Sequence, residues 1–271
     1  MPELPEVETT LNGIRPYLQG QNLVKLVVRE RKLRWPIQAG LESRISGQKI
    51  GNLQRRGKYI LLPLSQGGLI IHLGMSGSMR VLLNNEQPEK HDHFDLVNEK
   101  GYIVRFRDPR KFGCLLYTSK DIYSHPRIVS LGVEPLSEIF NGEMLYSLSR
   151  TRPVSIKSFI MNSKVVVGIG NIYASEALFL SGIHPLRKSN NISRQRYQRL
   201  VDCIKQVLTK AIKAGGTTLQ DFVGADSSPG YFKQELSVYG REGQFCIKCK
   251  STIKRITIGQ RSTFYCPACQ R

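Results

Sequence analysis

Two residues at the start of the chain, Pro2 and Glu3, place an amine and a carboxylate side by side. Removal of Met1 would leave Pro2 with a free secondary amine, which can condense with a sugar aldehyde carbon to an iminium. An ordinary α-amine titrates at about 7.7–8.0, so part of it is uncharged near neutral pH. Taken alone, the stretch is more often a plain helix start, because Pro5 fits a first helical turn.

Four cysteines near the end of the chain have the spacing of a zinc site. They form two Cys-x2-Cys pairs, Cys246 with Cys249 and Cys266 with Cys269. Four thiolates complete a tetrahedral shell and leave no position for a catalytic water. The spacing therefore predicts one structural Zn2+. Arg261 lies in the turn before the second pair, within reach of a phosphate, although a lone arginine is more often solvated.

Short polar loops elsewhere carry cations and aromatic side chains. The loop 108–113 holds an arginine, a lysine and a phenylalanine, which suits phosphate contacts and apolar wedges between bases. His72 ends one apolar run, and Lys58 precedes another. The stretch 168–171 allows a tight turn in which Asn171 caps the next helix and exposed amides hold a phosphate. Each motif alone is more often structural.

Composition favours a polyanion as partner. The chain has 271 residues, and 40 Lys+Arg against 21 Asp+Glu give a formal net charge of +19. This excess fits nucleic acid first and an acidic membrane surface second. The sequence has neither an apolar run long enough to span a bilayer nor the pattern of a signal peptide. A cytoplasmic protein is expected, with Cys114 and Cys203 as buried thiols.

Two halves of different texture must position these residues. Short β-branched and aromatic runs between Leu23 and Tyr117 predict a β-sandwich or a barrel. A linker is expected at 119–133. Helical periodicity follows in three segments, 154–161, 172–180 and 193–213. Strand-like pieces resume around the last four cysteines, so the tail is expected to be a small metal-bound module.

The motifs occur together and in one order, which makes the chain similar to a known family. Residues 2–9, the turn at Asn171 and the four cysteines closely resemble formamidopyrimidine-DNA glycosylases, bacterial enzymes that excise oxidised purines. Leu4 favours this branch over the related endonuclease VIII branch. The resemblance covers essentially the whole chain and implies an α+β multidomain fold. Its parts would be an N-terminal β-sandwich with an N-terminal helix (1–130), a helix–two-turns–helix domain (131–235) and a four-cysteine zinc finger (236–271).

The resemblance implies a bifunctional DNA glycosylase and AP lyase of base excision repair. Pro2 would attack C1′ of a flipped nucleotide, release 8-oxoguanine or a formamidopyrimidine, and form a Schiff base. Glu3 would be the acid, and β- and δ-elimination would leave a gap flanked by phosphates. The implied partner is double-stranded DNA with oxidised purines or abasic sites. A monomer in the bacterial cytoplasm, associated with the nucleoid through DNA, is expected.

Further roles follow from the resemblance position by position. Lys58 and Lys157 match lysines of the catalytic site. Lys58 also matches a phosphate-clamping position, together with His72, Asn171 and Arg261. These cations and amides would supply the counter-charge that makes DNA binding tight and salt-dependent.

Five other positions match contacts to the bases. Glu6 and Tyr231 match residues of the base pocket. Met75, Arg110 and Phe112 match the three residues that fill the vacated stack. Arg110 would face the orphan cytosine.

The chain departs from the family pattern at two places. Asn162 stands where family members commonly carry Asp, and Ser227-Ser228 stand where Gly-Lys is frequent. The serines lie in the loop 224–231, which the resemblance assigns to closure over the flipped base. Compared with Gly-Lys, the two serines remove a cation from this loop, so we expect the affinity for the lesion to be the property that is affected.

Three alternatives stay open at the level of sequence. A non-catalytic DNA-binding protein with the same scaffold would keep Met1 or form no imine. A zinc-ribbon RNA-binding protein would prefer single-stranded RNA to lesion duplex, although no stacking platform is apparent. Within the enzyme interpretation, a preference for oxidised pyrimidines would show in a panel of lesions.

Overall fold

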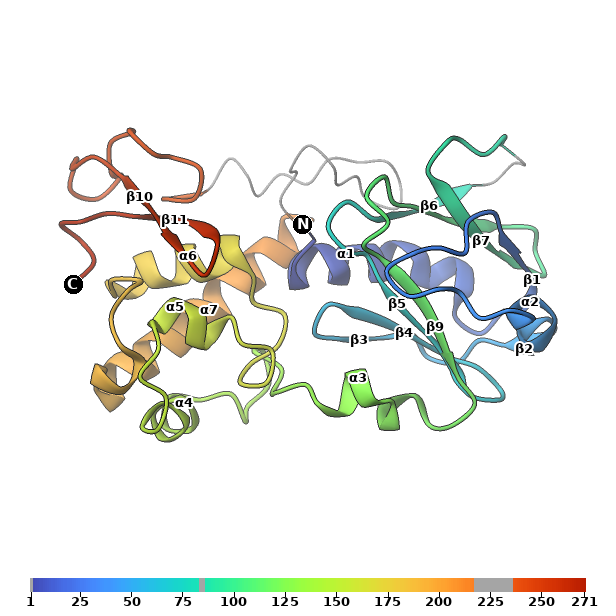
Figure 1. Cartoon of the computed structure of the whole chain (residues 1–271), viewed down its shortest axis with the longest axis horizontal. Helices are drawn as coiled ribbons and strands as arrows, with labels where there is room; N and C mark the ends of the chain where they lie inside the picture. Colours follow the sequence, from blue (N-terminus) through green and yellow to red (C-terminus); the bar gives the residue numbers. More distant parts are fainter. Residues whose placement is uncertain (1, 83–85, 217–235) are drawn as a thin grey trace. The chain divides into compact units, whose positions relative to one another are not determined.

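The computed structural model describes residues 2–82, 86–216 and 236–271 (Figure 1). Tyr231 and the Ser227-Ser228 pair lie outside the described residues. Within these ranges, helices are all too short or too polar to cross a membrane.

Two compact units make up the chain. One consists of Met1–Val129 with Ala214–Lys233, and the other of Ser130–Lys213 with Gln234–Arg271. The boundary after Val129 falls inside the stretch expected as a linker. The three-domain boundaries derived from the sequence stay a prediction.

Within the described ranges, nine strands of the first unit form two antiparallel sheets, ordered β2-β1-β7-β8-β6 and β3-β4-β5-β9. The strands are β1 (Asn22–Val28), β2 (Gln48–Lys49), β3 (Gln54–Arg56), β4 (Tyr59–Pro63), β5 (Gly68–His72), β6 (Ser78–Leu82), β7 (Asp92–Asn98), β8 (Ile103–Arg107) and β9 (Cys114–Thr118). Both sheets contribute to one hydrophobic core. In it the rings of Phe94 and Phe106 stack 4.7 Å apart, and Ile60 and Ile71 come from the other sheet. The predicted β-sandwich is confirmed.

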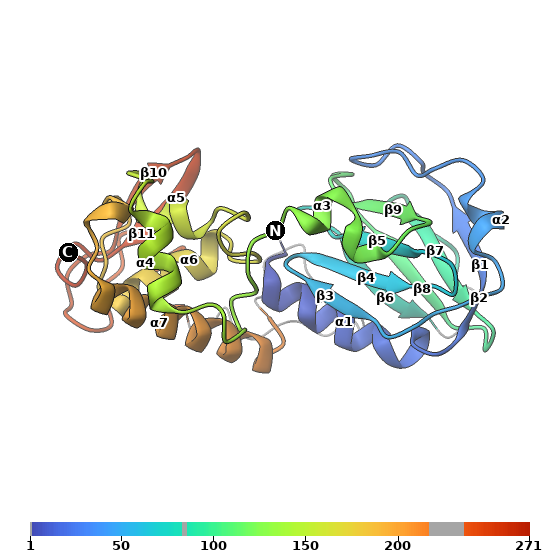
Figure 2. The same ribbon diagram turned by 90° about the horizontal axis from the view of Figure 1, so that it is seen from below.

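Helix α1 (Leu4–Leu18) covers one edge of the sandwich (Figure 2). It packs against β6 and β3, which are the edge strands of the two sheets. Val7, Leu11 and Ile14 follow a helical period and are at most 1% exposed. Pro5 lies in the first turn, as predicted. This packing fixes the start of the chain against the core.

The remaining helices of the first unit are short. They are α2 (Leu41–Ile45), the 3-10 helix η1 (Ile122–Ser124) and α3 (Pro126–Val129). The expected linker is therefore partly helical. Asp121 begins η1, because its carboxylate accepts the backbone N–H of Tyr123 at 3.2 Å.

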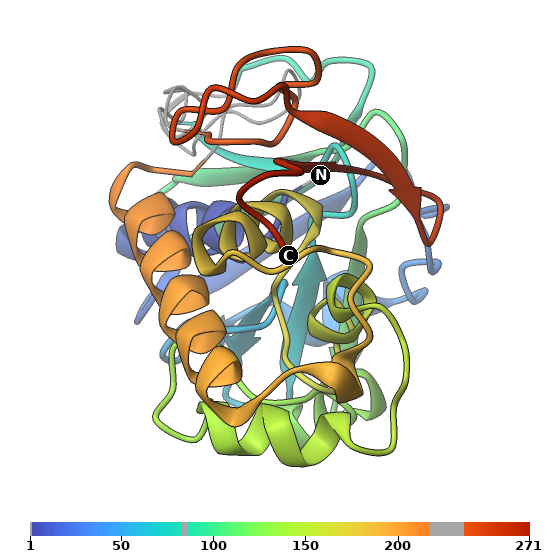
Figure 3. The same cartoon turned by 90° about the vertical axis from the view of Figure 1, so that its left-hand side faces the viewer.

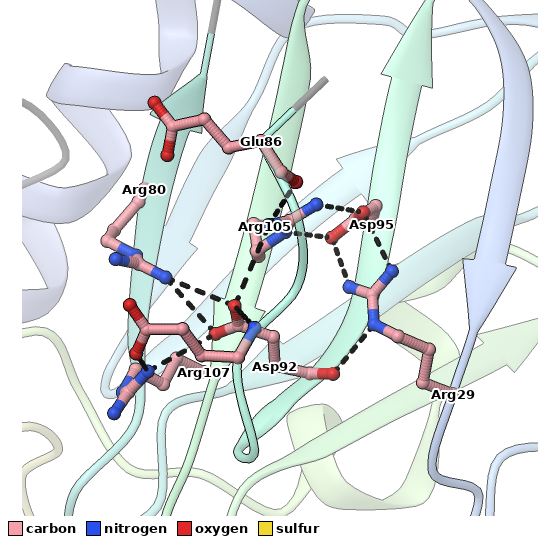
Figure 4. Close-up of polar contacts among 8 residues, drawn as sticks. Arg29, Arg80, Glu86, Asp92, Asp95, Arg105 and Arg107 are labelled. Carbon is pink, nitrogen blue, oxygen red and sulfur yellow. Dashed lines mark hydrogen bonds and ion pairs between the residues drawn. The ribbon is translucent and has the colours of Figure 1, made fainter. Parts of the chain in front are cut away.

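An ion network lies on the sheet face opposite the core (Figure 4). Asp95 accepts paired hydrogen bonds from Arg29 (2.9 and 2.5 Å) and from Arg105 (2.9 and 3.0 Å). Asp92 accepts from Arg80 at 3.2 Å. Burial raises the pKa of Asp95, but the hydrogen bonds from Arg29 and Arg105 bring it below its usual range. Because Asp92, Asp95 and Arg105 are buried and paired, the network links β6, β7 and β8.

The second unit is helical and carries one β-hairpin. Its elements are α4 (Gly142–Ser149), α5 (Ile156–Ile160), α6 (Asn171–Ser181), η2 (Ser189–Asn191), α7 (Arg194–Lys213), β10 (Lys254–Ile258) and β11 (Arg261–Tyr265). Helix α7 packs against α4 and α6, and β11 packs against α6 (Figure 3). Phe179 of α6 shares a small core with Phe264, Cys246 and Cys266. The predicted helical half is confirmed, with the cysteine module packed on α6.

Candidate functional site

The backbone at the start of α1 is held by a capping box. The Glu3 N–H donates to Oε2 of Glu6 at 2.8 Å, and the Glu3 carboxylate accepts the backbone N–H of Glu6 in return. Both glutamates are 2% exposed, and Pro2 is buried. Gly216 passes close by, since a Cβ there would lie 3.3 Å from Glu6. Three predicted residues thus meet at the helix end where backbone N–H groups carry partial positive charge.

Lys58 lies in the turn just before β4 and close to His72, because Tyr59 pairs with His72 across β4 and β5 and the charge of Lys58 acts on the His72 ring. Nδ1 of His72 accepts the backbone N–H of Gly74 at 2.9 Å, which assigns the ring proton to Nε2. Burial, with the nearby charges of Lys58 and Arg34, lowers the pKa of His72 to about 4. At physiological pH the imidazole is therefore neutral and offers Nε2–H as a donor, which suits a phosphate oxygen.

The low pKa of His72 predicts a pH-dependent stability. In the unfolded chain a histidine titrates near 6.5, so between about pH 6.5 and 4 the unfolded state binds the extra proton. Stability is therefore lost as the pH falls through this window. Relative to wild type, His72→Gln should be destabilised at pH 7.5, and this difference should shrink by about 1–3 kcal/mol at pH 4.5. Urea unfolding of both proteins at the two pH values measures the difference in their free energies of unfolding. An equal difference at both pH values would contradict the assignment of His72 as neutral.

Met75, Arg110 and Phe112 lie on two adjoining loops of the first unit. Met75 follows β5, and the other two lie between β8 and β9. The loops touch, because the backbone N–H of Arg110 donates to Oγ of Ser76 at 3.2 Å. The guanidinium of Arg110 lies 5.0 Å from the ring centre of Phe112, which is 43% exposed. The three residues predicted to fill a vacated base stack are thus gathered on one surface.

Asn171 does not cap helix α6, so that expectation is wrong. Gly170 is the N-cap residue, and Asn171 is the first residue of the helix. The Oδ1 of Asn171 accepts from Nζ of Lys157 at 2.6 Å, and its Nδ2 donates to the carbonyl of Ser262 at 2.9 Å. Lys157 is 1% exposed and also donates to Oγ1 of Thr263 at 2.7 Å. The buried ammonium requires oxygen acceptors, which draws the amide away from the helix end.

Arg261 follows the turn of the β10–β11 hairpin. Gly259 and Gln260 form the turn with φ of 54° and 60°, the left-handed conformations of a type I′ turn. Arg261 itself is exposed. Its neighbour Ser262 accepts from Asn171, so the hairpin carries Arg261 close to Asn171. Two predicted phosphate contacts therefore share one region of the second unit.

The four cysteines of the tail converge on one point. The cluster is Cys246, Cys249, Cys266 and Cys269, whose Sγ atoms all lie within 4.8 Å of one another. Four sulfur donors at this spacing fit one tetrahedral Zn2+ and leave no room for a catalytic water. Cys114 and Cys203 are 0% and 9% exposed, as expected of core thiols.

Sequence reasoning missed two residues that hold predicted ones in place. Thr263 is 0% exposed and accepts from Lys157. Asp108 is 0% exposed and accepts from Ser76 at 2.6 Å. The signal for Asp108 was its place before Pro109, a pattern typical of a turn whose carboxylate binds the following backbone. No sequence pattern points to Thr263, because its partner Lys157 is far away in the sequence.

The fold and its residue clusters define a class, a helix–two-turns–helix protein with a zinc finger and an N-terminal β-sandwich. Three family models match these parts: Formamidopyrimidine-DNA glycosylase N-terminal domain (1–115), Formamidopyrimidine-DNA glycosylase H2TH domain (131–223) and Zinc finger found in FPG and IleRS (243–271). The chain belongs to the formamidopyrimidine-DNA glycosylase family.

Known relatives match over their full length. The formamidopyrimidine-DNA glycosylases of Ectopseudomonas mendocina (strain ymp) and Pseudomonas aeruginosa (strain LESB58) are 53% and 52% identical over 271 residues, which is 100% of each chain. The crystal structure of the MutM (Fpg) protein of Thermus thermophilus is 35% identical, with a TM-score of 0.88, covering 99% of this chain and 98% of that one. Lactococcus lactis Fpg in complex with DNA containing an abasic site is 31% identical, with a TM-score of 0.89, covering 99% of both chains. The resemblance, the fold class and the zinc site are confirmed.

Proposed function

We propose that this chain is a DNA glycosylase and AP lyase of base excision repair that removes oxidised purines from duplex DNA. The observation that carries the proposal is the cluster of Pro2, Glu3 and Glu6 in a chain that matches the family from end to end. Lactococcus lactis Fpg has been crystallised with DNA containing an abasic site, and a mutant of it with DNA containing Fapy-dG, which supports this substrate class. The proposed site of action is the nucleoid in the bacterial cytoplasm, where the enzyme works as a monomer.

The proposed chemistry begins after Met1 is removed. The lone pair of the Pro2 nitrogen attacks C1′, and the oxidised base leaves with the electrons of the glycosidic bond. The attached nitrogen gives up its proton, which the departing base takes up, and so regains the lone pair that the iminium needs. Glu3 gives a proton to O4′, so that the sugar opens and a cationic iminium forms. The iminium acidifies C2′–H, and successive β- and δ-eliminations expel the 3′ and the 5′ phosphate. Water then hydrolyses the imine and frees Pro2.

Two groups of polar residues would hold the DNA backbone. Lys58 and neutral His72 offer donors on the first unit, and Asn171 and Arg261 offer donors on the second. Cationic contacts of this kind make affinity fall steeply with salt. We place Lys157 in this group through its bond to Asn171, whose amide it orients. A direct catalytic role of Lys157 stays a prediction.

Contacts to bases would come from five residues. Glu6 lies beside Pro2 and lines the pocket for the flipped base in this proposal. Tyr231, outside the described residues, is proposed for the same pocket. Met75, Arg110 and Phe112 would enter the gap that the flipped nucleotide leaves, where apolar wedges offset lost stacking. Arg110 would then read the orphan base.

Arg110→Ala should weaken discrimination by the opposite base more than affinity for DNA. A well-placed arginine–base contact is worth about 1–3 kcal/mol of discrimination, so the cytosine-to-adenine ratio of kcat/KM should fall by about 5–100-fold. Affinity for an abasic duplex should change by less than about fivefold, because phosphate contacts remain. Lys111→Ala is the matched control, since it removes a cation from the same loop. An unchanged ratio in the Arg110 variant would reject the assignment.

Borohydride trapping tests the proposed function as a whole. The enzyme is incubated with a duplex that carries 8-oxoguanine opposite cytosine, and the cross-linked peptide is mapped by mass. An adduct on Pro2 would support processing, lesion recognition and imine chemistry together. Tight binding without an adduct would favour a non-catalytic DNA-binding protein. The same assay on oxidised pyrimidines tests the substrate class.

A further inference from the structure

Asp108 is a fully buried carboxylate between the two loops that carry Met75, Arg110 and Phe112. Its Oδ1 accepts the hydroxyl of Ser76 at 2.6 Å and the backbone N–H of Arg110 at 3.3 Å. Its Oδ2 accepts the backbone N–H of Gly113 at 2.7 Å. All three hydrogen bonds come from uncharged donors. One of them crosses from the Met75 loop, and the other two come from the loop of Asp108 itself.

The backbone of Asp108 is held as firmly as its side chain. Its N–H donates to the carbonyl of His91 at 3.0 Å. Its carbonyl lies 2.6 Å from Nε2 of His93, which is 4% exposed, and it also accepts the N–H of Lys111 at 3.2 Å. Each polar group of the residue thus has a partner. A shift of Asp108 would break several bonds at once.

The two loops also touch backbone to backbone. Gly74 has φ +69°, and a Cβ there would lie 2.4 Å from atoms of Phe112 and Gly113. A Cβ on Gly113 would lie 2.8 Å from the carbonyl of His72. Side chains are excluded from this contact, so the loops form one packed unit. The spacing between Met75 and Phe112 is set by this unit.

The strands below the loops are equally constrained. Asp108 directly follows Arg107, the last residue of β8, and Arg107 lies 3.8 Å from Asp92. Asp92 also binds Arg80 of β6, the strand that begins just after the Met75 loop (Figure 4). The strands next to both loops, β8 and β6, are therefore held in place by ion pairs to Asp92.

We propose that Asp108 is a positioning residue that ties the Met75 loop to the Arg110–Phe112 loop and thereby sets the preference for the base opposite the lesion. The inference rests on the proposed role of these three residues in DNA. A side chain that reads a base edge needs a fixed approach, and a loosened loop lets Arg110 reach several bases about equally well. Phosphate contacts, which tolerate small shifts, depend less on Asp108.

A carboxylate is required at this place because it meets donors on both oxygens. An asparagine here, in either amide orientation, would point its NH2 group at one of the two backbone donors, Arg110 N–H or Gly113 N–H. The Ser76 hydroxyl can turn and accept instead, but the backbone donors cannot. Asp108→Asn therefore keeps the volume of the side chain and disturbs its hydrogen bonds. Ser76→Ala removes both bonds that Ser76 makes across the loops, the one to Asp108 and the one from the backbone N–H of Arg110, and leaves the Asp108 carboxylate in place.

The test measures single-turnover cleavage of 8-oxoguanine opposite cytosine and opposite adenine, with affinity for an abasic duplex and Tm. In Asp108→Asn the cytosine-to-adenine rate ratio should fall by about 3–10-fold, with a smaller fall in Ser76→Ala. Asp121→Asn is the control, since it makes the same chemical change at an exposed turn and should keep the ratio. Affinity should stay within about threefold of wild type in all three.

The outcomes are decisive in each direction. Equal loss of both rates, or a lower Tm with an unchanged ratio, would mean that Asp108 is merely structural. If Asp108→Asn does not fold, Ser76→Ala decides, and an unchanged ratio there overturns the inference. Failure of the proposed function looks different, because wild type itself would then cleave neither duplex. A ratio that falls in Arg110→Ala but not in the Asp108 and Ser76 variants would separate base reading from loop positioning and overturn the role of Asp108.

Discussion

A Pro2→Gly variant should lose glycosylase activity on an 8-oxoguanine duplex by on the order of 10³-fold or more and still bind the duplex. Glycine keeps a terminal amine after Met1 is removed, so the variant replaces the secondary amine by a primary one. A secondary amine gives an iminium that is always cationic, whereas glycine gives an imine that is a weaker electron sink unless it is protonated. Glycine also frees the backbone that proline restricts. The capping box of Glu3 and Glu6 does not involve the side chain at position 2 and should persist.

Pro5→Ala is the matched control for this variant. Pro5 lies in the first turn of the same helix but has no free amine. Its replacement should leave cleavage within about threefold of wild type, since alanine is a good helix former. Single-turnover cleavage and borohydride trapping measure both variants, and mass spectrometry verifies that Met1 is absent. Wild-type turnover in Pro2→Gly would remove the basis for the N-terminal nucleophile.

Features that are encoded locally could be predicted from the sequence. The zinc cluster follows from its spacing, because two Cys-x2-Cys pairs bring sulfurs together wherever they lie in a fold. Helix α1 follows from the period of its apolar residues and from Pro5. The sandwich follows from short apolar runs, although the strand order across its two sheets does not.

Features that depend on distant partners could not be predicted. Lys157 donates to Thr263, which lies 106 positions further along the chain. The prediction that Asn171 caps its helix is wrong because the Oδ1 of Asn171 accepts a hydrogen bond from Lys157 instead. Asp95 and Arg105 stand on the polar face of their strands, where solvated residues are the usual expectation. They are buried because they pair with each other. His72 is a neutral donor because of its bond from Gly74, its burial and the nearby charges of Lys58 and Arg34.

The second large effect is expected from Cys249→Ser, which should lose zinc, thermal stability and DNA affinity together. Cys246 and Cys266, its partners in the cluster, are 0% exposed and share a core with Phe179 and Phe264. Removal of one ligand opens the tetrahedral set, and structural zinc sites of this kind contribute directly to folding. Without zinc, the small core that Phe179 and Phe264 form under the β10–β11 hairpin would be destabilised.

The expected loss of DNA affinity in Cys249→Ser comes from loosening of the β10–β11 hairpin and not from the missing thiol itself. Strand β11 carries Arg261, and its Ser262 and Thr263 hold Asn171 and the buried Lys157. When the hairpin loosens, the Asn171 amide loses its orientation and Arg261 its place. Loss of the two proposed phosphate contacts should weaken binding to an abasic duplex by about 10–100-fold and lower the salt dependence of affinity.

Cys203→Ser is the control, because Cys203 lies on α7 at 9% exposure and outside the cluster. It should keep zinc and DNA affinity, with at most a modest loss of stability. Metal analysis, thermal unfolding and binding titrations at two salt concentrations measure all three properties. A Cys249→Ser protein that binds no metal but holds DNA at wild-type affinity would show that the hairpin keeps its shape without zinc. In that case Lys157, Asn171 and Thr263 alone would suffice to position Arg261.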